Sequence, residues 1–567
     1  MKKIVLGSLM ACTALAANAQ KYLGVATSNY SGISGMYLNP ANIADNRERL
    51  VIDFLNINTG IDNSLGKINT IGNVYTFIKD DNANVNDVFS FSNKEKFSLH
   101  APYAEVRGPG VMVSINHRHS FAVTTRLRGT NQFNNFDQTL YRTILDTSYA
   151  SQGNVALTAQ NFNWTAHVWM EAALSYGAIV LEKGRHEVKV GATVRYLGGL
   201  GYLGLKGNNL DVGYVKGQDS FYANNTDLSY ASNILTAEGA LSITNSNFFK
   251  KFFGKSQGNG IGADLGVVYD YMGDDNTERY DMDGKTGLSN QEVNRYKVRV
   301  SASVTDIGHI TYDQKNNYGL SISGDGYLTS RGLSGNVKNF DDFRNYAKSQ
   351  GFRADTGRIT SKVYMPTTMI LSADYHASRN IYVNAMYIGN LANRQNYGNS
   401  YYNQFTLTPR YDTRNYSIGV PITYSTLTTA MKLGVGIRAK GFFIGSDDML
   451  VFFTNRQYGL NVYGGAYLVL HKRRPADRDR DHVSDSKDRC PDDFGSWRYK
   501  GCPDKDENNS ADSADNCPEA TGLPVRHENR TGRRNEADNT QHEEGRAPNT
   551  EDKAGTGNKF FSRAQIG

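Results

Sequence analysis

The sequence predicts an all-β protein: a transmembrane antiparallel β-barrel of about fourteen strands, then a short irregular calcium-type segment and a disordered tail. The chain has 567 residues, is rich in Tyr (35), Phe (25) and Gly (56), and contains only 12 Pro. After the N-terminus it has no run of about eighteen apolar residues, so no transmembrane helix is expected. Long stretches instead alternate apolar and polar residues, which is typical of strands with one apolar face.

The first nineteen residues have the pattern of a secretory signal peptide. Two lysines follow Met1, an apolar stretch comes next, and Ala17-Asn18-Ala19 predicts cleavage before Gln20. An alternative is a lipoprotein-like box ending at Cys12, which would leave an apolar core of only about eight residues. If Cys12 is removed with the signal, the other three cysteines lie close together in an exported segment, and this favours a disulfide.

The predicted barrel occupies residues 20–474. Alternation is clear over residues 164–176, 188–196, 296–304 and 431–437, and the last strand is predicted from Tyr458 to His471. Strands of soluble proteins usually have about five or six residues and membrane strands about nine to eleven, so the lengths favour a membrane barrel over a soluble sandwich. In the third stretch Val300 is expected to face lipid and Ser301 the lumen.

Four connections are too long for turns: residues 134–150, 217–232, 274–291 and 332–356. We expect all four to be extracellular loops, because they are long and carry Asn, Asp, Gly and short helix-like patterns. The even strand number returns the chain to its starting side, which agrees with a periplasmic segment after the barrel. The third contains Asp281-Met282-Asp283-Gly284, which could begin a calcium loop. Later ligands are missing, so a turn is predicted there.

The polar faces of the predicted strands are basic: Arg126, Arg128, Lys189, Arg195, Lys297, Arg299, Lys432 and Arg438. A positive lumen would attract anionic solutes. The alternative, which we favour, is pairing with carboxylates such as Glu171, so that side chains fill the lumen. The net charge of +6 is too small for this length to indicate nucleic-acid binding. No Ser/His/Asp arrangement or metal-type His spacing is evident, so no enzyme is expected.

Residues 475–519 contain two copies of an acidic ladder, with oxygen side chains at positions 1, 3, 5, 9 and 12. This is the spacing by which a short loop surrounds Ca²⁺, which takes about six to eight oxygen ligands. Position 12 is Asp rather than Glu, and Cys-Pro follows two residues later, so an EF-hand is excluded. The predicted ligands are Asp477, Asp479, Asp481, Asp485 and Asp488 in the first loop, and Asp504, Asp506, Asn508, Asp512 and Asp515 in the second.

The ladders, together with Cys490-Pro491-Asp492-Asp493, Gly501-Cys502-Pro503-Asp504 and Cys517-Pro518-Glu519, resemble thrombospondin type 3 repeats. Such repeats join an outer-membrane barrel to a periplasmic domain in OmpA-type proteins. The resemblance implies weak Ca²⁺ binding and a periplasmic C-terminus. The family usually has Gly at position 6, where this chain has His482 and Asn509. It also implies a Cys490–Cys502 disulfide with Cys517 left over, and the alternative is Cys502–Cys517.

Asn39-Pro40-Ala41, shortly after the signal peptide, resembles a segment of FadL-like and related outer-membrane barrels of the Bacteroidota. The tail, residues 520–567, has too few apolar residues for a core and lacks the peptidoglycan-binding signature of OmpA-type domains. Two functions follow from these resemblances. One is an OmpA-like envelope-structural role, with outer-membrane lipid and the cell wall or periplasmic envelope proteins as partners. The alternative is a FadL-like transport or secretion-accessory barrel that passes a hydrophobic or anionic solute.

Overall fold

The computed structural model describes residues 22–68, 89–92, 94–139, 154–214, 220–233, 256–273, 279–315, 317–329, 331–332, 337, 340–450, 453 and 458–504. The chain forms two compact units. One comprises Met1–Tyr280 with Ser289–Arg474, and the other Asp281–Leu288 with Pro475–Gly567.

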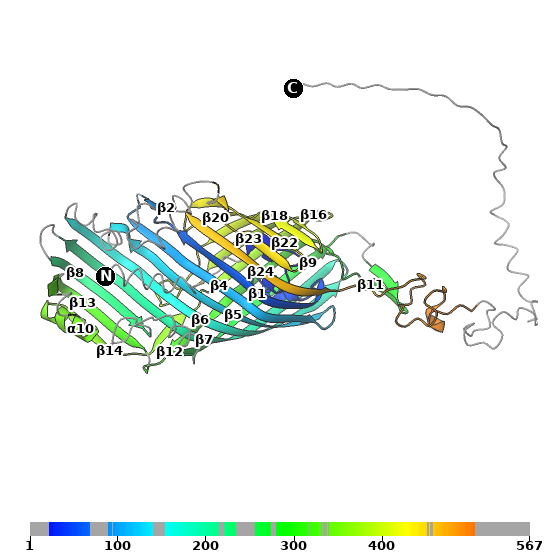
Figure 1. Ribbon diagram of the computed structural model, residues 1–567, viewed down its shortest axis with the longest axis horizontal. Coiled ribbons are helices and arrows are strands. Elements are labelled where there is room, and N and C mark those ends of the chain that lie inside the picture. Colours follow the sequence, from blue (N-terminus) through cyan, green and yellow to red (C-terminus); the bar gives the residue numbers. More distant parts are fainter. Residues whose placement is uncertain are drawn as a thin grey trace, which may run out of the picture. The chain divides into compact units, whose positions relative to one another are not determined.

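The first unit is a closed antiparallel β-barrel (Figure 1). It closes because β1 (Glu48–Asn63) pairs with both β4 (Lys96–Ser114) and β24 (Gly459–His471). Its other strand segments are β5 (His119–Asp137), β6 (Val155–Lys183), β7 (His186–Tyr214), β8 (Ser220–Ser232), β9 (Gly258–Met272), β12 (Tyr296–Tyr312), β13 (Tyr318–Thr329), β14 (Arg353–Arg358), β15 (Ser361–Tyr364), β16 (Thr368–Ser378), β17 (Ile381–Asn390), β18 (Gln404–Asp412), β19 (Tyr416–Gly419), β20 (Ile422–Ser425), β21 (Ala430–Leu433), β22 (Val435–Ala439) and β23 (Phe442–Ser446).

These twenty segments make fourteen wall-crossing strands, because several are consecutive parts of one strand. The segments β8 and β9 both pair with β7 and continue one another. In the same way β12 continues into β13, β14 into β15 and β16, β19 into β20, and β21 into β22. The predicted fold class and strand number are confirmed.

The outer surface of the barrel is apolar and its interior is polar. Val123, Leu174 and Val194 lie side by side on β5, β6 and β7, and each is more than half exposed. Val300 also faces outward, at 49% exposure, whereas Ser301 lines an internal cavity, so both predicted orientations are confirmed. A closed barrel with this surface is the fold of an outer-membrane protein. Among the described residues, no helix is both long and apolar enough to cross a membrane.

One end of the barrel carries the start of β1 and the last residue of β24, since Glu48 pairs with His471. We call it the linker end, because β24 leads there into residues 475–519, the linker. The strand pairings place the connection between β9 and β12 at this end too, because Tyr271 on β9 pairs with His186 beside the β6–β7 turn. The β7–β8 and β13–β14 connections lie at the opposite end, so the prediction that all four long connections lie on one side of the membrane was wrong. Alternation does not show in which direction a strand runs, and the connection over residues 274–291 was placed by its length and composition.

The opposite, far end of the barrel carries the β7–β8 and β13–β14 connections. Most of the loop predicted over residues 217–232 is the strand β8, and residues 332–356 include α10 (Phe340–Ser349) and part of β14. A small pair of strands, β2 (Gly66–Ile68) and β3 (Phe89–Phe91), completes the first unit.

The second unit combines a hairpin with the segment that follows the barrel. The hairpin consists of β10 (Arg279–Met282) and β11 (Lys285–Ser289). Asp283 and Gly284 have φ of 56° and 71°, so the turn predicted at these residues is confirmed. The following segment, residues 475–519, is called the linker. Its one described helix is η4 (Trp497–Tyr499).

Candidate functional site

Residues 22–47 form a plug in the lumen. The plug contains three short helices, α2 (Leu23–Ala26), α3 (Ile33–Met36) and η1 (Pro40–Ile43), and nearly all of its residues are buried. The η1 helix packs on β6, β7 and β9, whereas α2 packs on β18, β19, β22 and β23. Because these strands lie in different parts of the wall, the plug bridges the lumen. The cavity between the plug and β12, β16 and β17 has a volume of only about 60 Å³.

The Asn-Pro-Ala segment attaches the plug to the wall. Asn39 Oδ1 accepts a hydrogen bond from Ala41 N at 2.9 Å and so caps η1. Its Nδ2 donates to the main-chain carbonyls of Val267 on β9 and Ala302 on β12, at 3.0 and 3.1 Å. The wall approaches closely here, since a Cβ at Gly191 would lie 2.2 Å from Ala41 N. From the sequence this segment was singled out only by its resemblance to FadL-like barrels, and its contacts with the wall were not predicted.

A second attachment is aromatic. The guanidinium of Arg107, on β4, lies between the rings of Tyr22 and Tyr37, 4.0 and 4.1 Å from their centroids. Glu105 pairs with the same guanidinium at 2.5 Å. A cation between two aromatic faces, away from water, stabilises the contact more than it would at an exposed surface. Arg107 was not predicted as a lumen residue, because a register shift between Arg107 and Gly110 interrupts the alternation of β4.

Three arginines and two carboxylates form a buried cluster, the arginine cluster, across β5, β6, β7 and β12. Its members are Arg126, Arg128, Arg195, Glu171 and Asp306. The Glu171 carboxylate lies 2.6–3.2 Å from all three guanidinium groups, and Asp306 lies 2.7–3.1 Å from them. Both acids are at most 6% exposed. Asp306 was not predicted, since it lies at a break in the alternation of β12, with φ 59°.

Most of the other predicted lumen cations are paired as well. Lys189 contacts Asp270 at 2.7 Å and Asp45 of the plug at 3.4 Å. The remaining pairs are Arg299 with Asp270, Lys432 with Asp62, and Arg438 with Asp412. The exception is Lys297, whose ammonium lies 4.8 Å from the centre of the Tyr375 ring. Internal pairing, the interpretation favoured from the sequence, is therefore confirmed.

An apolar cluster of buried side chains lies toward the far end of the barrel. It consists of the side chains of Leu65, Phe97, Leu99, Ala101, Phe133, Phe136, Ala159, Phe162, Leu210, Ala223, Ala347, Phe352 and Ala354. Phe136 contacts Phe97, Phe133 and Phe162 edge to face, with ring centroids 5.2–6.1 Å apart. These aromatic side chains make this end of the barrel compatible with a hydrophobic solute.

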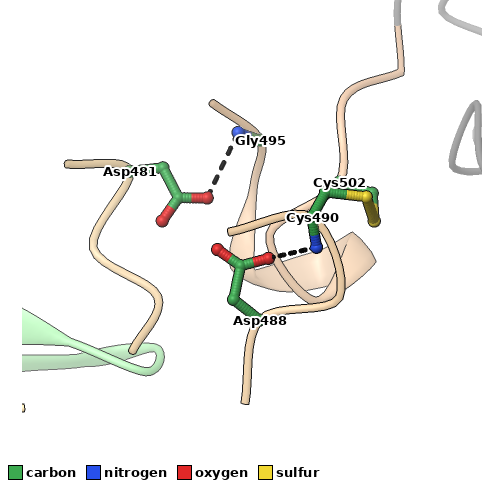
Figure 2. The surroundings of a disulfide bond; sticks show 5 residues. All are labelled: Asp481, Asp488, Cys490, Gly495 and Cys502. Atoms are coloured by element: carbon green, nitrogen blue, oxygen red, sulfur yellow. Dashed lines mark hydrogen bonds between the residues drawn. A yellow bond between two sulfur atoms is a disulfide. The ribbon is translucent and has the colours of Figure 1, made fainter. Parts of the chain in front are cut away.

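In the linker, the first predicted calcium loop brings three of its five acids together. One carboxylate oxygen from each of Asp477, Asp479 and Asp481 lies within 4.8 Å of the others. Asp481 also accepts a hydrogen bond from Val483 N. Figure 2 shows the bond that Asp481 accepts from Gly495 N and the one that Asp488 accepts from Cys490 N. The pKa of Asp479 is raised, mainly because its carboxyl group is partly desolvated. The negative charges of Asp481, Asp488 and Asp477 raise this pKa further. These oxygens could hold a hard cation.

Two further features bear on this loop. His482, at position 6, has φ 69°, so the sharp turn forms without the glycine that the repeat family usually has there. Buried oxygens of Asp477, Asp479 and Asp488 have no hydrogen-bond partner among the described residues. Asp485 is different, since its carboxylate accepts a hydrogen bond from Arg478 N at 2.9 Å.

A disulfide joins Cys490 to Cys502, the pairing that the repeat pattern implied (Figure 2). Of the second loop, only Asp504 is among the described residues. Asp506, Asn508, Asp512 and Asp515 lie outside them, as do Cys517, the tail and the signal peptide.

Comparison with known proteins places the chain in a family. No curated protein is significantly similar in sequence. Among solved structures, the toluene transporter TbuX of Ralstonia pickettii is 11% identical over 78% of this chain and 94% of its own, with a TM-score of 0.32. A FadL homologue of Pseudomonas aeruginosa is 11% identical over 80% and 97%, with a TM-score of 0.36. The toluene transporter TodX of Pseudomonas putida is 8% identical over 80% and 97%, with a TM-score of 0.24. Residues 40–447 match a family described as a family of unknown function, DUF5723, and because this match spans well over half of the chain, the protein belongs to DUF5723.

Proposed function

We propose that this chain is an outer-membrane transport barrel that passes a hydrophobic solute, with the plug as its closure at the linker end. The observation that carries this proposal is the plug itself, which fills the lumen and is attached through Asn39 to two strands of the wall. A barrel with only an envelope-structural role could be closed by its own inward-facing side chains. A separate folded segment with its own attachments is what a closable passage requires.

A hydrophobic solute fits the lumen better than an anionic one. The three guanidinium groups of the arginine cluster pair with Glu171 and Asp306, and Arg195 also pairs with Asp264, so they offer little net attraction to an anion. The apolar cluster, in contrast, provides aromatic side chains toward the far end of the barrel. The resemblance of Asn39-Pro40-Ala41 to the FadL-like segment supports the same choice.

The plug predicts a low conductance that rises when the plug is displaced. Gly191→Val should increase single-channel conductance in planar bilayers, because even its Cβ would lie 2.2 Å from Ala41 N. Asn39→Ala, which removes both wall hydrogen bonds, should have the same effect. Gly357→Val is the matched control, since a Cβ at Gly357 meets no atom within 4 Å. Equal conductance in all of these variants, each verified as folded, would mean that the wall side chains close the lumen by themselves.

Passage of solute is measured separately, with proteoliposomes and a fluorescent fatty acid. Wild-type protein should accelerate transfer of the probe relative to protein-free vesicles, and a soluble anion of similar size should not enter faster. If the protein does not accelerate transfer of the probe while Gly191→Val still conducts ions, the barrel is closable but transport of a hydrophobic solute is excluded. The envelope-structural role, with lipid and the cell wall or periplasmic envelope proteins as partners, would then be favoured.

We also propose that the linker lies in the periplasm and binds Ca²⁺ weakly, with a Kd of roughly 10⁻⁴–10⁻³ M, as extracellular modules do. The convergence of Asp477, Asp479 and Asp481 supports this. Calorimetry on the full-length protein should show a binding step that Asp479→Asn weakens at least about tenfold. Asp492→Asn is the control, because Asp492 is exposed and pairs with Arg478 outside the trio. Absence of any calcium heat at millimolar concentration would leave the linker an acidic spacer.

A further inference from the structure

The geometry points to a docking role for the β10–β11 hairpin: we propose that it holds the first acidic loop of the linker, with Asp283 as the positioning residue. The hairpin belongs to the connection between β9 and β12, so docking attaches the linker to the barrel chain at a second point besides β24. Figure 1 shows β11 (green) beside the linker (orange), within one compact unit.

Asp283 makes four hydrogen bonds to the linker. Its carboxylate accepts from Ser484 N and Ser484 Oγ, both at 2.9 Å, and from Lys487 Nζ at 2.6 Å. Its main-chain N–H donates to the carbonyl oxygen of His482 at 2.8 Å. The side chain of Asp283 is only 12% exposed, so water competes weakly for these bonds. All three partner residues lie between positions 6 and 11 of the acidic ladder.

The neighbouring residue of the turn makes a second, apolar contact. Gly284 lies against the indole of Trp497, and a Cβ there would be 2.5 Å from the ring atoms Cδ1 and Nε1. Trp497 lies between Cys490 and Cys502, so the disulfide closes the loop that presents this ring. The hairpin therefore contacts two separate parts of the linker, the acidic ladder and the disulfide loop. Two separate contacts fix the orientation of the hairpin relative to the linker, whereas a single contact would leave it able to rotate.

The docking contacts do not involve the proposed calcium ligands. None of the hydrogen bonds from Asp283 involves Asp477, Asp479 or Asp481, so the hairpin holds the loop with or without a cation. It also holds the loop near the ligand geometry, because His482 and Ser484 directly follow Asp481. Docking should therefore raise the calcium affinity of the loop if the loop binds calcium.

Limited trypsin digestion of the full-length protein in detergent tests the docking, with cleavage at Arg478, Arg480, Lys487 and Arg489 as the readout. Asp283→Gly removes the carboxylate but keeps the positive φ without strain. It should speed cleavage about tenfold, the factor that corresponds to losing one to two net hydrogen bonds when cleavage follows the open population. Asp283→Asn, which keeps an oxygen for Ser484, should give an intermediate rate. Asp313→Gly, at an exposed aspartate outside the hairpin, is the matched control.

Trp497→Ala and reduction of the disulfide should also speed cleavage, through the second contact. Equal rates for wild type, Asp283→Gly and Trp497→Ala would overturn the docking. Repeating the digestion and calorimetry with millimolar calcium separates the two proposals. Faster cleavage of Asp283→Gly with no calcium effect in any variant would support docking and refute calcium binding. Calcium binding with equal affinity in wild type and Asp283→Gly would refute the positioning role of Asp283.

Discussion

Replacing Glu171 with glutamine is expected to destabilise the barrel by about 3–5 kcal/mol, the usual effect of removing one partner from a buried ion pair. Glu171 accepts charge-assisted hydrogen bonds from Arg126, Arg128 and Arg195, and its carboxylate is 3% exposed. Glutamine keeps the size but removes the charge, so the three guanidinium groups would lose the one carboxylate, other than Asp306, that contacts all of them. Urea unfolding in lipid vesicles, followed by tryptophan fluorescence, measures the change in free energy of unfolding.

The matched control is Glu182→Gln on the same strand. Glu182 pairs with Arg118 at 3.3 Å, but both side chains are partly exposed, at 24% and 50%. Exposed pairs contribute about 0–1 kcal/mol, so this variant should unfold close to wild type. Similar free energies of unfolding for the two variants would show that water reaches the arginine cluster in the membrane.

Val194→Arg is expected to destabilise the barrel by about 2–4 kcal/mol if the position lies near the bilayer midplane, with less effect nearer an interface. Val194 is 60% exposed on β7, beside Leu174 and close to Val123, and no polar residue is paired with it across β6. An arginine there would place its charge in hydrocarbon. The same unfolding measurement applies, together with the fraction of protein that resists denaturation by detergent at room temperature.

Val194→Leu is the control for this second variant, since it alters size while keeping the surface apolar. It should fold and unfold like wild type. If the arginine variant did the same, the row formed by Val123, Leu174 and Val194 would not contact lipid, and the apolar band of the barrel would have to lie elsewhere on its wall.

The wall of the barrel could be predicted from the sequence because each strand has its own local pattern. Val300 faces lipid and Ser301 does not, since period-two alternation depends only on neighbouring residues. The acidic ladder and the Cys490–Cys502 disulfide could also be predicted, because a short repeat fixes the spacing of its residues.

The plug could not be predicted in the same way, because it depends on contacts far apart in the chain. The need for glycine at position 191 arises only when Pro40 and Ala41 lie against β7. Asp306 likewise interrupts a strand pattern and gains its partners from β5, β6 and β7. The connection that contains the hairpin was grouped with the far-end connections for a related reason, since the direction of β9 follows from its pairing with β7 and not from its own residues.

The position of the plug also constrains the order of assembly. The plug precedes every strand in the chain, yet Tyr30 accepts a hydrogen bond from Tyr467, which lies 437 residues later. Its other contacts come from β6, β7, β9 and β22, so its binding surface does not exist until the wall is nearly complete. Such distant contacts form slowly, because loop-closure entropy opposes them. The plug is therefore among the last segments to fold although it precedes the strands in the chain, and sealing of the β1–β24 seam and capture of the plug should be a single late kinetic event.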